Sequence, residues 1–267
     1  MRRESTSERI TDVVFDFDLT LCPIHLHSTM SEFLDDPRFN KHHDEITSRE
    51  GHDWEIQEGV LQPWSSRTIE YMWNVLKQYG VLKFSESEAG MKAAKEWRDI
   101  IMNLIDNNYR VSIASFGSFR PLIEKYLTDI VMLPPEYMKK ITVHSWMPVN
   151  PDSQDTNKNA HLDRIMRSIP PTEEINLTTQ VLSDEQRRLF YRRLILIDDS
   201  GKNTAAVNSL LGDENHSIKV NSDDPGYKNP EIVRNKLTTI LGISFNPRPG
   251  EERLVAPEVN ADNRHRP

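Results

Sequence analysis

Apolar runs alternate with segments of helical periodicity along most of this chain. One run begins at Val13 and a later one at Leu194, and neither contains a polar residue before the carboxylate that ends it. A strand that is buried on both faces of a parallel sheet has this continuous apolar pattern. The predicted strands are these two runs, up to Asp16 and Asp199, and the segments at about 109–115, 141–146 and 217–220.

Between the strands, apolar residues recur at the spacing of amphipathic helices. The clearest helix runs from Pro63, a residue suited to a first turn, to about Tyr79. Ser85 and Glu88 have the spacing of a capping box, which predicts that the next helix opens there and continues to about Asn107. Further helices are predicted at about 119–132, 158–167, from 183 onward, at 203–211 and at 230–241.

The alternation of strands and helices predicts an α/β fold with a central parallel sheet flanked by helices. The segment from about Cys22 to Phe84 departs from this alternation, because short acidic and histidine-rich pieces precede its helix. The segment 246–267 is rich in Pro, Asn and charged residues and has no periodicity, so we expect it to be a disordered tail.

Charge narrows the class of partner. The 267 residues carry a formal net charge of -8, which does not favour nucleic acid or an anionic membrane. The basic pairs Arg187-Arg188 and Arg192-Arg193 are expected on the solvated face of a helix. From this charge we expect no nucleic-acid partner. No apolar run approaches the length that spans a bilayer, so we also expect no membrane segment.

The sequence also indicates a compartment. Residues 1–11 are charged and lack the apolar core of a secretion signal. Cys22 is the one cysteine of the chain, so no disulfide can form within it, which fits a reducing environment. We therefore expect a cytoplasmic protein.

Side chains that can do chemistry gather where predicted strands end or helices begin. Ligands of parallel α/β sheets bind beyond the carboxyl ends of the strands, and neighbouring carboxylates there are costly unless a cation pairs with them. Each residue alone has a structural explanation, as a turn, a cap or a surface lysine. Their common position in the fold favours a site instead. The candidates are Asp16, Asp18, Ser115, Lys158, Asp198 and Asp199.

In this order the candidates resemble the four motifs of the haloacid dehalogenase-like (HAD) superfamily. The specific elements are Asp16-Phe17-Asp18-Leu19-Thr20 and the segment from Leu196 to Ala206, whereas Ser115 and Lys158 are assigned by position. The resemblance extends from about 13 to 241. Many members have a further aspartate four residues past the metal-binding one, where this chain has Asn203.

The resemblance implies a Rossmann-like core formed by residues 10–21 and 85–245. It also implies that residues 22–84 form a mainly helical cap inserted after the first strand. Caps of this kind close over a site and select the substrate. The segment 147–157 is too short to hold a cap at the other customary insertion point.

The resemblance further implies a phosphatase, a phosphoric monoester hydrolase of the HAD type. Asp16 is then the nucleophile that forms an aspartyl phosphate, and Asp18 is the general acid and base. Ser115 hydrogen-bonds a phosphoryl oxygen, and Lys158 offsets negative charge on Asp16 and the transferred group.

The implied cofactor is Mg²⁺, which prefers oxygen ligands. It is expected on Asp16, the backbone carbonyl of Asp18 and Asp199, with Asp198 as a ligand or directly behind one. The substrate is either a small phosphorylated metabolite or phosphotyrosine in a protein. Two alternatives remain: a phosphotransferase or mutase with the same intermediate, and a catalytically weak HAD-like binding module.

Overall fold

The structure is a computed structural model that describes residues 9–26, 29, 66–78, 80, 82–116, 120–145, 158–167, 182–220 and 230–245. Its strands form a five-stranded sheet in the order β3-β2-β1-β4-β5, and all neighbouring strands pair in parallel. The predicted α/β class with a central parallel sheet is therefore confirmed. The strands are β1 (Asp12–Asp16), β2 (Arg110–Ser115), β3 (Ile141–Ser145), β4 (Leu194–Asp198) and β5 (Ser217–Lys219).

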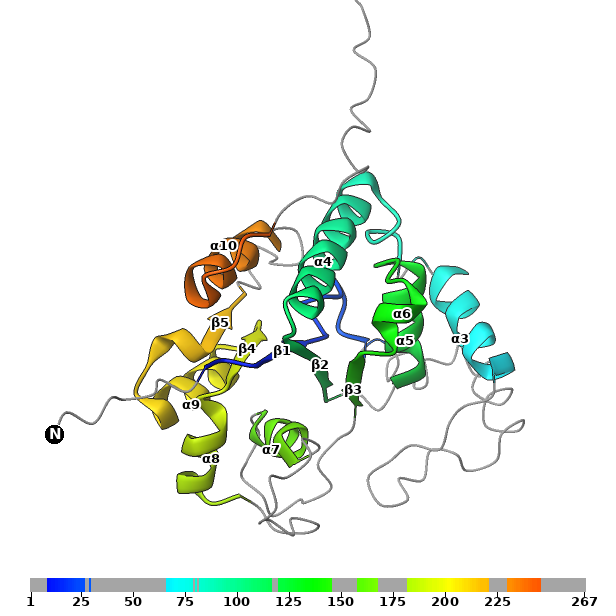
Figure 1. Cartoon of the computed structure of the whole chain (residues 1–267). Helices are drawn as coiled ribbons and strands as arrows, with labels where there is room; N and C mark the ends of the chain where they lie inside the picture. Colours follow the sequence, from blue (N-terminus) through cyan, green and yellow to red (C-terminus); the bar gives the residue numbers. More distant parts are fainter. Residues whose placement is uncertain are drawn as a thin grey trace, which may run out of the picture.

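Helices cover both faces of the sheet (Figure 1). One face carries α4 (Glu88–Asp106), α5 (Arg120–Asp129) and α10 (Pro230–Leu241), and the other carries α7 (Asn159–Arg167), α8 (Asp184–Tyr191) and α9 (Gly201–Leu211). Shorter turns follow α5 and α9, namely α6 (Pro135–Met138) and the 3₁₀-helix η2 (Glu214–His216). The sequence patterns predicted neither of these short turns.

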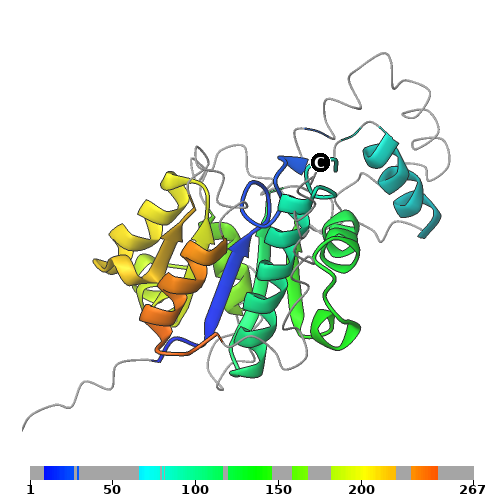
Figure 2. The ribbon, with the colours of Figure 1, turned by 90° about the horizontal axis from the view of Figure 1, so that it is seen from above.

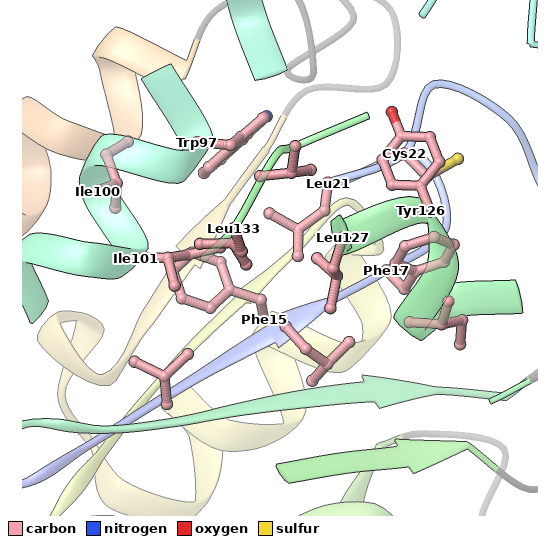
Figure 3. Packing of buried hydrophobic residues seen from close by; sticks show 14 of the residues in the cluster. Phe15, Phe17, Leu21, Cys22, Trp97, Ile100, Ile101, Tyr126, Leu127 and Leu133 are labelled. Carbon is pink, nitrogen blue, oxygen red and sulfur yellow. The ribbon is translucent and has the colours of Figure 1, made fainter. Parts of the chain in front are cut away.

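The core is divided by the alternation of side chains along the strands. Phe15 packs edge-to-face on Trp97 of α4 with ring centroids 6.0 Å apart, and Phe17 packs in the same way on Tyr126 of α5 at 5.4 Å (Figure 3). Val14 instead belongs to the core between the sheet and α7, α8 and α9. Asp16, between the two phenylalanines, therefore projects toward the layer that contains α7.

The beginning of α4 differs from its prediction. The N-cap is Ser87, whose hydroxyl oxygen accepts a hydrogen bond from the backbone N–H of Gly90 at 3.2 Å. The predicted capping box of Ser85 and Glu88 is thus wrong, because the buried hydroxyl of Ser85 lies 3.2 Å from the hydroxyl of Tyr126 instead. Gly90 is required where it stands, since a Cβ there would overlap the carbonyl oxygen of Phe84.

Other boundaries differ by a few residues. The helix α5 ends at Asp129 rather than near Met132, whose φ of 60° lies in the left-handed region, and α9 begins at Gly201 rather than at Asn203. The start of α8 is as predicted, because Ser183 and Gln186 form a capping box.

Only parts of the predicted 22–84 insertion fall among the described residues. They include α3 (Ser66–Gln78), which lies beside α5 (Figures 1 and 2). Lys125 of α5 joins the two helices: its Nζ lies 2.6 Å from a carboxylate oxygen of Glu70 and 5.6 Å from the ring centroid of Trp73. The insertion at 30–65, the predicted loop at 147–157 and the predicted tail at 246–267 lie outside the described residues. Within the described part, no helix is long and apolar enough to cross a membrane.

Candidate active site

The carboxyl ends of three adjacent strands bring the predicted site residues together. Asp16 ends β1, Ser115 ends β2 and Asp198 ends β4, and β1 lies between the other two strands. Parallel pairing places these ends at the same edge of the sheet, which is where ligands of such sheets bind. Asp18, Asp199 and Lys158 join them from the segments that directly follow β1 and β4 and directly precede α7.

A tight loop after β1 holds Asp18. The carbonyl oxygen of Phe17 accepts hydrogen bonds from the backbone N–H groups of Leu21 at 3.1 Å and Cys22 at 2.9 Å. Leu19 has a φ of 59°, a conformation that costs a residue with a Cβ about 1 kcal/mol or more. Such strain persists where the surrounding structure determines it, and it clusters at functional sites.

The carboxylate of Asp18 has two hydrogen-bond donors from different parts of the chain. The backbone N–H of Leu26 donates to Oδ1 at 2.7 Å, and the hydroxyl of Ser115 donates to Oδ2 at 3.1 Å. Burial, and next the negative charge of Asp16, raise the pKa of Asp18. The hydrogen bond from Leu26, then the nearby His25 and the buried Lys158, lower that pKa by smaller amounts. A carboxyl with a raised pKa retains its proton at higher pH, as a general acid must.

Lys158 supplies positive charge to the site. It is buried, and its Nζ lies 2.6 Å from Oδ1 of Asp16 and donates a hydrogen bond to the carbonyl oxygen of Ala114 at 2.7 Å. The same ammonium lies 4.3 Å from the ring centroid of Phe116, within the range of a cation–π interaction.

Three carboxylates form a cluster that fits a divalent cation. One carboxylate oxygen from each of Asp16, Asp198 and Asp199 can be chosen so that all lie within 4.8 Å of one another. Mg²⁺ prefers oxygen ligands of this type. Asp198 is fixed by the backbone N–H of Ser200 at 2.8 Å and by Nδ2 of Asn203, which lies 2.9 Å from both carboxylate oxygens. The side chain of Asn203 therefore holds a carboxylate of the cluster.

Burial and mutual repulsion in this cluster raise the pKa values of two of its carboxyl groups. Burial, and next the charge of Asp16, raise the pKa of Asp198 to about 8 and that of Asp199 to about 6. A divalent cation between the carboxylates would remove the second of these causes.

These shifts predict how stability depends on pH and on metal. A carboxyl whose pKa is higher in the folded than in the unfolded protein binds its proton more tightly in the folded state. Its contribution to the free energy of unfolding therefore falls as pH rises. For Asp199 this fall spans the pH window from 3.8 to about 6.

The variant Asp199→Asn tests this dependence in the presence of EDTA. We expect the difference in melting temperature, variant minus wild type, to be more positive at pH 7 than at pH 4. We also expect Mg²⁺ to raise the wild-type melting temperature more at pH 7. Thermal unfolding followed by circular dichroism measures both, and an effect of Mg²⁺ equal at the two pH values would contradict the prediction.

Sequence reasoning missed the roles of two residues, one beside the site and one on α8. His161 is fully buried, and its Nε2 lies 2.9 Å from the carbonyl oxygen of Ser115. Its position three residues after Lys158 is the signal that could have placed both side chains on one side of the start of α7. Arg187 was expected on a solvated face, which is wrong: it forms a largely buried ion pair with Asp163, with its closest contact at 2.8 Å.

Comparison with known proteins assigns no family to this chain. No protein-family model matches it, and a search of curated proteins gave no significant match. The function is therefore inferred from the side chains at the carboxyl edge of the sheet.

Proposed function

We propose that this protein is a Mg²⁺-dependent phosphomonoester hydrolase that acts through an aspartyl phosphate on Asp16. One observation carries the proposal: the carboxylate of Asp16 lies 2.6 Å from the ammonium of Lys158 and also belongs to the carboxylate cluster with Asp198 and Asp199. A nucleophilic carboxylate repels a phosphate dianion, so it needs cations on the side from which the phosphate approaches. The ordered resemblance to the HAD superfamily motifs supports the same function.

In the first step, a carboxylate oxygen of Asp16 attacks the phosphorus of the monoester, and the bond to the leaving oxygen breaks. Protonated Asp18 gives its proton to that oxygen. The ammonium of Lys158 offsets the charge on Asp16 and on the transferred group. The hydroxyl of Ser115, which donates to Asp18 in this structure, then turns to a phosphoryl oxygen.

In the second step, Asp18 has become a carboxylate and takes a proton from a water molecule. That water attacks the phosphorus of the aspartyl phosphate, so that inorganic phosphate leaves and Asp16 is regenerated. Asp18 thus acts first as an acid and then as a base, and its hydrogen bonds from Leu26 and Ser115 orient it for both tasks.

Asp16, Asp199 and the backbone carbonyl of Asp18 would hold Mg²⁺, with Asp198 as a ligand or directly behind one. Bound Mg²⁺ supplies positive charge that offsets the phosphoryl oxygens and the carboxylate cluster. The chain contributes the rigidity of this arrangement, because Asn203 and Ser200 fix Asp198.

Residues 22–84 are proposed as a helical cap over this site. The substrate is accordingly either a small phosphorylated metabolite or phosphotyrosine in a protein. A cytoplasmic location is part of the proposal and is consistent with the free, buried thiol of Cys22.

Hydrolysis of a chromogenic aryl phosphate by the purified chain tests the function. We expect release of phosphate in Mg²⁺, no release in EDTA, and recovery when excess Mg²⁺ is added back. Release that persists in EDTA would contradict the proposal. Transfer to an added alcohol without hydrolysis would favour the phosphotransferase, whereas binding of phosphate esters without turnover of any of them would favour the binding module.

A further inference from the structure

The end of β2 is held by two side chains associated with the same helix. Lys158, directly before α7, donates to the carbonyl oxygen of Ala114 at 2.7 Å, and His161, in the first turn of α7, contacts the carbonyl oxygen of Ser115 at 2.9 Å. Two consecutive carbonyl groups at the exit of the strand thus bind the amino end of one helix. Because a carbonyl oxygen only accepts hydrogen bonds, Nε2 of His161 carries a proton and donates it.

Phe116 joins the same arrangement. Its ring stands at 90° to the imidazole of His161 with centroids 4.9 Å apart, and the ammonium of Lys158 lies 4.3 Å from its centroid. The histidine therefore contacts both the backbone of Ser115 and the ring beside the active-site lysine. A shift of the imidazole would move these two neighbours together.

The rest of α7 is anchored as well. Leu162, Ile165 and Met166 belong to the core between this helix and the sheet. Asp163 accepts hydrogen bonds from Arg187 and from the hydroxyl of Tyr191, the latter at 2.7 Å. These contacts make α7 a fixed support from which His161 can hold the end of β2.

We infer that His161 is a positioning residue for the proposed phosphatase reaction. It fixes the carbonyl of Ser115, so that the hydroxyl of the same residue faces Asp18, and with Phe116 it holds Lys158 against Asp16. The inference rests on the proposed function, because a positioning role has meaning only where these groups act on a phosphoryl group. His161 itself contacts none of the reacting atoms.

Three substitutions separate the hydrogen bond from the volume of the side chain. The amide nitrogen of His161→Gln reaches about as far as Nε2 and can donate, whereas the shorter His161→Asn and the apolar His161→Leu cannot donate there. We expect kcat with an aryl phosphate to fall about 30-fold or more in the Asn and Leu variants and less than about 5-fold in the Gln variant, with KM changed by less than about 5-fold in all three.

His216 provides a matched control. Its Nδ1 lies 3.1 Å from the carbonyl oxygen of Leu194, the first residue of β4, at the edge of the sheet away from the site. His216→Leu therefore removes the same kind of contact, a histidine to a strand carbonyl, and we expect a lower melting temperature with wild-type kcat. If His161 were merely structural, its variants would behave in the same way.

A second readout does not depend on turnover. Beryllium fluoride with Mg²⁺ mimics a phosphoryl group on a carboxylate, and we expect it to raise the melting temperature of the wild type beyond the effect of Mg²⁺ alone. The Asn variant should keep the shift caused by Mg²⁺ and lose at least half of the additional shift, while the Gln variant keeps most of it. If the Leu variant does not fold, the comparison of Gln with Asn carries the test.

The outcomes separate the two proposals. Wild-type kcat in the Asn and Leu variants, or an equal loss in the Gln and Asn variants, would overturn the positioning role while leaving the phosphatase intact. If the wild type shows no turnover and no shift of the melting temperature with beryllium fluoride, the proposed function is overturned, and the role of His161 with it.

Discussion

Asp16→Asn is expected to lower the turnover of phosphomonoesters by about 10⁴-fold or more, the scale of loss when a nucleophile is removed. An amide has nearly the shape of a carboxylate, so the site keeps its packing, but it cannot form an acyl phosphate. The substitution also removes the charge that contributes to the raised pKa values of Asp18, Asp198 and Asp199. The variant should therefore fold, which circular dichroism measures, but should not hydrolyse phosphomonoesters, which steady-state kinetics measure.

The same substitution at the other end of β1 is the control. Asp12 is the first residue of the strand, is also buried, and forms an ion pair with Arg110. Asp12→Asn changes a carboxylate to an amide in the same strand but at the opposite edge of the sheet, so kcat should remain within about 3-fold of wild type. Comparable activity in Asp16→Asn and Asp12→Asn would rule out Asp16 as the nucleophile.

Arg187→Met is expected to lower the free energy of unfolding by about 3–5 kcal/mol, because it leaves a buried charge without its partner. The Nε of Arg187 lies 3.1 Å from both oxygens of Asp163, and a second guanidinium nitrogen lies 2.8 Å from one of them. The side chains are 11% and 5% exposed, so water replaces little of the lost interaction. Methionine preserves much of the apolar stem, so the loss reports chiefly on the charge. Urea unfolding measures the difference.

The neighbouring arginine and a double variant complete this test. Arg188 donates to the carbonyl oxygen of Leu210 from an exposed position, so Arg188→Met should cost about 1 kcal/mol or less. Adding Asp163→Asn to Arg187→Met removes the unpaired charge and should recover part of the stability. A loss for Arg187→Met no larger than that for Arg188→Met would show that the ion pair contributes little.

The central strands were predictable because a strand that is buried on both faces of the sheet has an unbroken apolar run in its sequence, such as the one from Leu194. Placing Asp16, Ser115 and Asp198 at one edge then required only that the strands be parallel, since parallel strands share the direction of their carboxyl ends. The clustering of these side chains thus followed from residue type, spacing and one rule of topology.

Contacts between distant segments were not predictable in this way. Arg187 is polar and precedes another arginine, which is also the pattern of a solvated face, and its partner Asp163 is on another helix. Ser85 has the spacing of a cap, but a hydroxyl on α5 competes for it and Ser87 caps the helix instead. Local periodicity carries no information about which element lies across an interface.

The residues on either side of Asp16 have a consequence for evolution. Phe15 and Phe17 are closed to solvent and pack on Trp97 and Tyr126 in the layer opposite α7, so the location of the carboxylate depends on a buried aromatic interior. In the proposed phosphatase, residues that select a substrate are then free to diverge without displacing Asp16. A lineage built on this arrangement can acquire new specificities while its aromatic residues stay under strong constraint, and directed evolution of this chain should follow the same division.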